Sequence, residues 1–225
     1  MRVGPARYNP VMTRLGIETG ARKTFAWAPD WPGWCRWAKD EAVVMATMER
    51  YAARYQPVAQ LAGHDFDPGA PLEVVERVPG NSSTDWGIPV VITGMDRLPT
   101  TAAEAERLAG PLAAVWRRFD VVAAGAPAEL RKGPRGGGRD TARVVEHVVA
   151  CDHGYARNIG LKLSAPAATD RDAVAEMRTH VLSLLGQPSD GAPLARKWNA
   201  RYALRYIAWH ALDHAWEIED RSNPV

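Results

Sequence analysis

The spacing of hydrophobic residues changes near residue 99 of this 225-residue chain. Before that point, short apolar runs alternate with segments rich in Gly, Pro, Ser and Asp, a pattern typical of strands joined by turns. The runs cover residues 23–28, 72–78 and 88–94. Apolar residues recur at spacings of three or four over about residues 40–55, which indicates one helix among the strands. We therefore predict a small α+β unit over residues 1–98.

After residue 99, apolar residues recur at helical spacing in four successive segments. Thr101 and Glu104 form a capping-box pattern at the start of the first. A glycine-rich basic loop over residues 131–139 leads into the second, and it lacks the Lys-Ser/Thr pair of a phosphate-binding loop. The third and fourth cover about residues 170–185 and 197–221. The modest connections between them predict an up-down four-helix bundle over residues 99–225, which makes the whole fold α+β.

Three histidines are the most informative feature of the predicted bundle. His147 lies on the second helix, and His210 and His214 lie four residues apart on the fourth. Such a pair shares one helix face and can reach a single divalent ion, while a third imidazole from a facing helix leaves one coordination position open. A lone histidine on an apolar face is more often a hydrogen-bonded core residue, but unpartnered buried imidazoles cost about 1–3 kcal/mol each. We therefore predict that these three histidines bind a metal, with His180 as a reserve ligand.

Other polar residues near the histidines have more than one interpretation. Glu217 follows His214 by three residues and is a candidate to orient an imidazole or to act as a general base, unless it is simply solvated. Asp213 either orients an imidazole or pairs with a surface arginine. Cys151 falls within the apolar stripe of its helix, which favours a packed thiol over a nucleophile. His153 falls on the opposite side of that helix and is expected in solvent.

An aromatic stripe occupies the other side of the fourth helix. Tyr202, Trp209 and Trp216 recur every seven residues, away from the histidines. Soluble monomers rarely leave such an apolar strip in water. We therefore expect it to be covered either by the N-terminal unit, where four tryptophans cluster over residues 27–37, or by a second copy in a homodimer.

Composition narrows the possible functions. The net charge of +2 is too small to predict binding of nucleic acid or of an anionic membrane. The two cysteines form neither a disulfide framework nor a paired-thiolate metal motif. The sequence has no signal-peptide pattern and no stretch of about 20 apolar residues. We therefore expect a cytoplasmic protein that acts on a small molecule.

The histidine pattern resembles that of a known family. One histidine within RVVEHVVACDHGYARNIG and an HxxxH pair within RYIAWHALDHAWEIEDR are similar to the DinB-like superfamily, over about residues 100–225. The resemblance implies a four-helix bundle in which His147, His210 and His214 hold a divalent ion such as Zn, Ni, Mn or Fe. The segment FAWAPDWPGWCRWAKDEAVVMATMERYAARY is similar to HicB-like segments, in which a strand pair precedes a helix. The strand-rich stretch over residues 64–98 departs from a minimal HicB-like unit.

The family resemblance also implies a function. DinB-like enzymes include thiol S-transferases that use bacillithiol or mycothiol, thiol-dependent isomerases and hydrolases. The implied activity is transfer of a low-molecular-weight thiol, as a cosubstrate, to a small electrophile, or a related hydrolysis or isomerisation. The competing hypothesis is a non-catalytic binding or regulatory protein, because HicB-like units occur in antitoxins.

Overall fold

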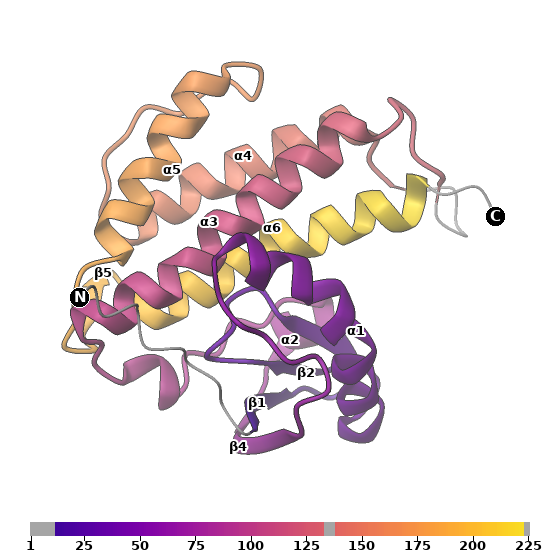
Figure 1. The fold of residues 1–225 in the computed structure, drawn as a ribbon, viewed down its shortest axis with the longest axis vertical. Helices are drawn as coiled ribbons and strands as arrows, with labels where there is room; N and C mark the ends of the chain where they lie inside the picture. Colours follow the sequence, from indigo (N-terminus) through magenta and orange to yellow (C-terminus); the bar gives the residue numbers. More distant parts are fainter. Residues whose placement is uncertain (1–11, 133–137, 223–225) are drawn as a thin grey trace, which may run out of the picture.

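A small sheet followed by helices makes up the computed structural model, which confirms the α+β class (Figure 1). The structure describes residues 12–132 and 138–222. The first eleven residues of the predicted N-terminal unit and the centre of the glycine-rich loop, residues 133–137, lie outside the described residues. No helix in the described ranges is both long and apolar enough to cross a bilayer.

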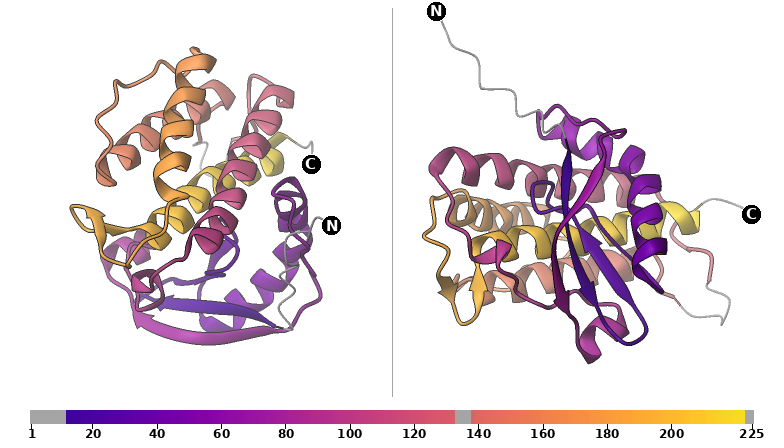
Figure 2. Two further views of the ribbon diagram at one scale, coloured as in Figure 1. Left: turned by 60° about the vertical axis from the view of Figure 1, so that its left-hand side comes forward. Right: turned by 90° about the horizontal axis from the view of Figure 1, so that it is seen from below.

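The sheet has four strands in the order β3-β2-β1-β4. They are β1 (Thr13–Thr19), β2 (Thr24–Trp27), β3 (Cys35–Ala38) and β4 (Leu72–Pro79). Neighbouring strands from β1 to β3 are antiparallel, whereas β4 pairs with β1 in parallel. A parallel pair needs a crossover connection, and helix α1 (Glu41–Leu61) provides it. The sheet lies across one side of the longer helices, with α6 running past it (Figure 2).

Two of the three predicted strands are confirmed, and the third is wrong. Residues 23–28 and 72–78 coincide with β2 and β4, but no strand forms over residues 88–94. In that segment the Val91 N–H donates to Glu18 Oε2 at 3.2 Å, and the Val91 carbonyl accepts from Arg205 at 2.7 Å. Buried side chains therefore satisfy these backbone groups where a neighbouring strand was expected.

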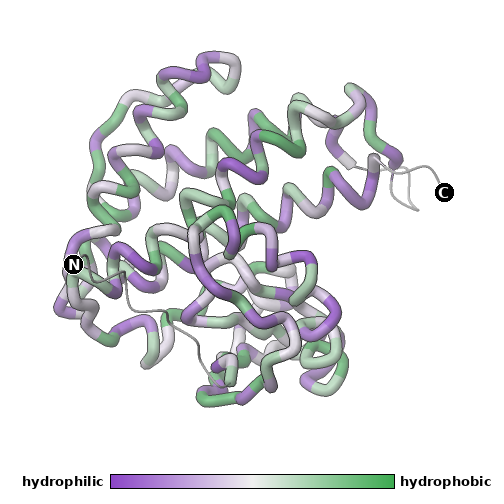
Figure 3. Tube along the Cα trace, viewed as in Figure 1, coloured by the Kyte–Doolittle hydropathy of each residue, from purple (hydrophilic) through white to green (hydrophobic). Residues whose placement is uncertain are grey.

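The helices form where the hydrophobic spacing predicts them. The long ones are α3 (Ala102–Gly125), α4 (Thr141–Asn158), α5 (Arg171–Leu185) and α6 (Ala200–Ser222); the short elements are α2 (Ser82–Trp86), a 3-10 turn (Met95–Arg97), β5 (Pro193–Ala195) and β6 (Trp198–Asn199). The predicted capping box of α3 is confirmed, since Thr101 and Glu104 each accept a hydrogen bond from the other's backbone N–H. Hydrophobic and hydrophilic stretches alternate along α3, as expected of a helix with one buried face (Figure 3), whereas every residue of α6 from Tyr202 to Leu212 is buried. Helices α5 and α6 each pack against both α3 and α4.

One hydrophobic core joins the sheet and the helices. Trp31 and Trp34, before β3, belong to the same buried cluster as Phe119 of α3 and Leu212 of α6. The hydrophobic core is therefore continuous across the boundary expected between residues 98 and 99. The division into two units stays a prediction.

The aromatic stripe of α6 is buried by the N-terminal unit, which is the first of the two coverings expected from the sequence. Tyr202, Trp209 and Trp216 are all at most 6% exposed. Trp209 packs edge-on against Phe25 of β2, and Trp216 packs against Tyr51 of α1. Within a single chain, the sheet and α1 thus cover the face of α6 that lies away from the histidines.

Candidate metal centre

Helices α4 and α6 bring the three predicted histidines into one cluster. Their ring centres are 5.1 Å apart for His147 and His210, 5.0 Å for His147 and His214, and 4.7 Å for His210 and His214. The pair on α6 shares a face because the two residues are one helical turn apart, and α4 packs against that face. His210 is buried, while His147 and His214 are half-buried.

The closest approach in the cluster is between two ring nitrogens. The Nε2 atoms of His147 and His210 are 3.2 Å apart. At this distance either one nitrogen donates a proton to the other, or both direct lone pairs at a shared cation. The remaining nitrogen of His210, Nδ1, is buried and has no hydrogen-bond partner within residues 12–132 and 138–222.

A carboxylate fixes the tautomer of His214. Glu217 Oε2 lies 2.7 Å from His214 Nδ1, and Glu217 Oε1 accepts from the Arg221 guanidinium at 2.7 Å. The hydrogen bond with His214 is the main cause of the lowered pKa of Glu217, so this group is a carboxylate near neutral pH. A carboxylate accepts the Nδ1 proton, which leaves the Nε2 lone pair of His214 available.

The buried surroundings keep the other two imidazoles neutral. Burial, with smaller contributions from His214, His147 and Arg139, lowers the pKa of His210 to about 3. Burial also lowers the pKa of His147, and the neighbouring His214 lowers this pKa further. Neutral imidazole is the form that binds metal ions, so these two side chains are ready to act as ligands at neutral pH.

Cys151 completes the cluster, which the sequence interpretation had not expected. One ligand atom from each of His147, Cys151 and His210 lies within 4.8 Å of the others, so these residues could hold a metal ion. Among the described residues this is the one group that meets that distance, and His214 is not in it, although its ring lies close to both histidines. The overlooked signal was the spacing, because Cys151 follows His147 by four residues and so shares its helix face.

The remaining candidates lie away from the cluster. His180, the reserve ligand, is exposed on α5. His153 is half-buried and not solvated as expected, because its Nε2 donates to the Leu163 carbonyl at 2.9 Å. Asp213 pairs with Arg36 at 2.5 Å, which agrees with the arginine alternative.

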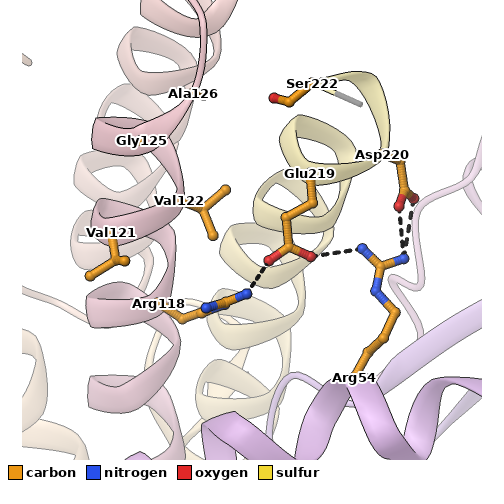
Figure 4. Close-up of a pocket in the computed structure, with 9 residues that line it drawn as sticks. All are labelled: Arg54, Arg118, Val121, Val122, Gly125, Ala126, Glu219, Asp220 and Ser222. Atoms are coloured by element: carbon orange, nitrogen blue, oxygen red, sulfur yellow. Dashed lines mark hydrogen bonds and ion pairs between the residues drawn. The ribbon is translucent and has the colours of Figure 1, made fainter. Parts of the chain in front are cut away.

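Two surface hollows among the described residues lie away from the histidines. A hollow of about 560 Å³ opens between α1, α3 and the end of α6. Figure 4 shows Arg54 and Arg118 both directed at Glu219 in this hollow. The charged side chains that line the hollow therefore neutralise one another. A second hollow, of about 450 Å³, lies between α3, α4 and α5. Neither is lined by any of the three histidines.

Compared with models of known families, with curated proteins and with solved structures, the chain matches none. Any assignment of function therefore rests on the geometry of the site.

Proposed function

We propose that this chain is a divalent-metal-dependent enzyme of DinB-like type that transfers a low-molecular-weight thiol to a small electrophile, or performs a related hydrolysis or isomerisation. The observation that supports the proposal is the convergence of His147, His210 and His214 from two helices, with two Nε2 atoms only 3.2 Å apart. The packing of α3, α4, α5 and α6 is consistent with the bundle that such a family requires.

The distances fit a metal ion. Nitrogen ligands lie about 2.0–2.1 Å from zinc, so two of them across a tetrahedral angle are about 3.3 Å apart. The observed separation of 3.2 Å between the Nε2 atoms of His147 and His210 agrees with this value. Imidazole suits Zn, Ni and Fe, which are three of the four expected ions.

The residues around the ion would have separate tasks. A divalent ion held there would supply Lewis-acid chemistry, lowering the pKa of a thiol or water that reaches it. Glu217 accepts the Nδ1 proton of His214 and so leaves its Nε2 free to bind an ion, and Arg221 holds Glu217 in place. Because both carboxylate oxygens are engaged, positioning is the role that this geometry favours for Glu217, while a role as general base stays a prediction.

The direct test is elemental analysis of protein purified without an affinity tag. We expect about one divalent ion per chain, and loss of that ion in His147→Ala, His210→Ala and His214→Ala. Stoichiometric metal in all three variants would refute the metal centre.

Activity separates a catalytic centre from a structural one. With a low-molecular-weight thiol and a generic electrophile, we expect turnover by metal-loaded protein and none after chelation. Equal turnover by chelated protein would show that the ion takes no part in the reaction.

A second candidate function is a non-catalytic binding or regulatory role. The observation that favours it is the strand pair β2–β3 directly before α1, which is the order expected of a HicB-like segment. Metal-loaded protein that turns over no thiol with any electrophile, and that co-purifies with a small partner protein, would favour this role. The cytoplasmic location and the possible homodimer likewise stay predictions.

A further inference from the structure

We propose that Cys151 is an additional ligand of the metal centre, which closes the site until a thiol cosubstrate displaces it. This inference rests on the proposed metal centre and adds to it a residue that the histidine pattern does not contain.

The placement of Cys151 follows from helix geometry. It lies one turn after His147 on α4, so both side chains leave the same face of that helix. Its Sγ is 3.8 Å from each ring nitrogen of His147. Together with a ligand atom of His210, these atoms lie within 4.8 Å of one another.

The distances agree with one tetrahedral ion. A sulfur at about 2.3 Å and a nitrogen at about 2.0–2.1 Å from zinc are about 3.6 Å apart across a tetrahedral angle. The observed 3.8 Å between Cys151 Sγ and His147 Nε2 is close to this value. The observed 3.2 Å between the Nε2 atoms of His147 and His210 is likewise close to the value of about 3.3 Å for two nitrogen ligands. Because Sγ is equally far from Nδ1 and Nε2 of His147, bonding of all three donors to one ion requires rotation of the Cys151 side chain towards Nε2.

The second cysteine shows what a packed thiol looks like in this protein. Cys35 is 3% exposed and belongs to a cluster of aromatic side chains that includes Phe25 and Trp27. Cys151 is half-buried, and its polar neighbours are His147 and Tyr155. A thiol binds a metal as the thiolate, and the ion itself supplies the charge that stabilises this form.

A fourth donor has a consequence for the substrate. With His147, His210 and His214, Cys151 would complete four ligands, and a four-coordinate protein site has no open position. A thiol cosubstrate then enters by displacing Cys151, and its proton passes to the departing sulfur. The exchange is balanced in protons and electrons and needs no further reactant.

Cobalt substitution tests the sulfur ligand in the full-length protein. A thiolate bound to Co²⁺ gives an intense charge-transfer absorption in the near ultraviolet, which imidazole does not. We expect this absorption in wild type without added thiol, its loss in Cys151→Ser, and its retention in Cys35→Ala. Far-ultraviolet circular dichroism of each variant checks that it is folded, and Cys151→Ala is the second variant should Cys151→Ser fail to fold.

Affinity gives an independent measurement. Changes to groups that only support a ligand weaken metal binding about 10–100-fold, and loss of the ligand itself should cost at least about tenfold. Because thiolate is a soft donor, the loss should be larger for Zn²⁺ than for Mn²⁺. Adding 2-mercaptoethanol to Co²⁺-loaded Cys151→Ala should restore the charge-transfer absorption, since the small thiol fills the position that the side chain left.

The outcomes separate this inference from the proposal beneath it. No uptake of Co²⁺ by wild type would overturn both. Uptake without the absorption, or an absorption that persists in Cys151→Ser, would overturn the role of Cys151 and leave the histidine centre standing. Failure of 2-mercaptoethanol to restore the absorption would show that external thiols do not take the position of Cys151.

Discussion

Helix α6 carries two buried polar clusters that differ in how they are satisfied. In the first, Arg205 donates to both oxygens of Asp96 at 2.7 Å and to the Val91 carbonyl, and neither charged residue has a buried polar atom without a partner. In the second, five residues further along the helix, His210 lies against two imidazoles and the Tyr155 ring, and its Nδ1 has no hydrogen-bond partner among the described residues. The first cluster is complete without anything else, whereas the second has lone pairs to offer. Most buried polar groups in folded proteins are hydrogen-bonded, so the unpartnered nitrogen of His210 calls for an explanation that the Arg205 cluster does not need.

The largest effect should come from opening the complete cluster. Asp96→Ala leaves Arg205 buried without its counter-charge, and breaking a buried pair in this way costs about 3–5 kcal/mol. Urea unfolding followed by circular dichroism measures the loss. Asp172→Ala, at an exposed position of α5, is the control and should stay within about 0.5 kcal/mol of wild type. If Asp96→Ala lowered the free energy of unfolding by less than about 1 kcal/mol, the Arg205–Asp96 cluster would not be an essential part of the fold.

The aromatic stripe should come next. Trp216 is 3% exposed beneath Tyr51, and its replacement by alanine should cost about 3 kcal/mol through lost burial and the cavity that remains. Metal stoichiometry should stay at the wild-type value, because the stripe faces away from the histidines. Trp86→Ala, at a tryptophan that is 82% exposed, is the matched control and should have little effect. Equal losses for the two variants would contradict the burial argument.

Metal addition should stabilise the open cluster and leave the complete one unaffected. An ion that binds only the folded state, at a concentration of 100 times its Kd, adds about 2.7 kcal/mol to the free energy of unfolding. The gain should appear in wild type and in His180→Ala, and disappear in His147→Ala and His214→Ala. Thermal unfolding with and without the ion measures it, and a gain that survives in both histidine variants would place the ion elsewhere.

The pH dependence of the metal-free protein tests the burial of His210. Its pKa falls from 6.5 to about 3 on folding, so it contributes stability that is present above pH 6.5 and lost as the pH falls towards 3. Between pH 8 and pH 5 the loss should be about 2 kcal/mol. His210→Gln should show a flatter profile over this range, while His180→Gln should keep the wild-type slope. An unchanged slope in His210→Gln would mean that this imidazole titrates normally.

The smallest effect should come from the group that supports a ligand. Glu217→Gln keeps an oxygen that can accept the Nδ1 proton of His214 but removes the charge, and such changes weaken metal binding about tenfold or more, or about 1.4 kcal/mol. Competition with a chromophoric chelator measures this. A fall in turnover far beyond the fall in affinity would instead support the general-base role.

The sequence predicts most of the helical fold because its signals are local. Capping at Thr101 and Glu104 and the apolar stripes depend on residues within a few turns of one another, and the four long helices form close to where these signals place them. Strands depend on distant partners. The apolar run over residues 88–94 looks like a strand, but Glu18 and Arg205 take the backbone groups that a strand would have paired.

The site divides in the same way. The spacing of His210 and His214 and the orientation of His147 are properties of single helices, so their convergence could be predicted once α4 and α6 were expected to face each other. The contribution of Cys151 could not be inferred from hydrophobicity, because a thiol in an apolar stripe is usually packed, as Cys35 is. Its greater exposure and its distance to His147 distinguish it from Cys35.

The position of α6 at the meeting point of both layers has a consequence for synthesis of the chain. The sheet and α1 are synthesised before α6. The sheet residues that cover Tyr202 and Trp209 in the folded protein, among them Phe25 and Trp27, are therefore left uncovered until α6 has been made. The histidine cluster is incomplete for the same interval, since two of its members arrive with α6. Docking of this one helix therefore covers that apolar surface and completes the histidine cluster in the same step.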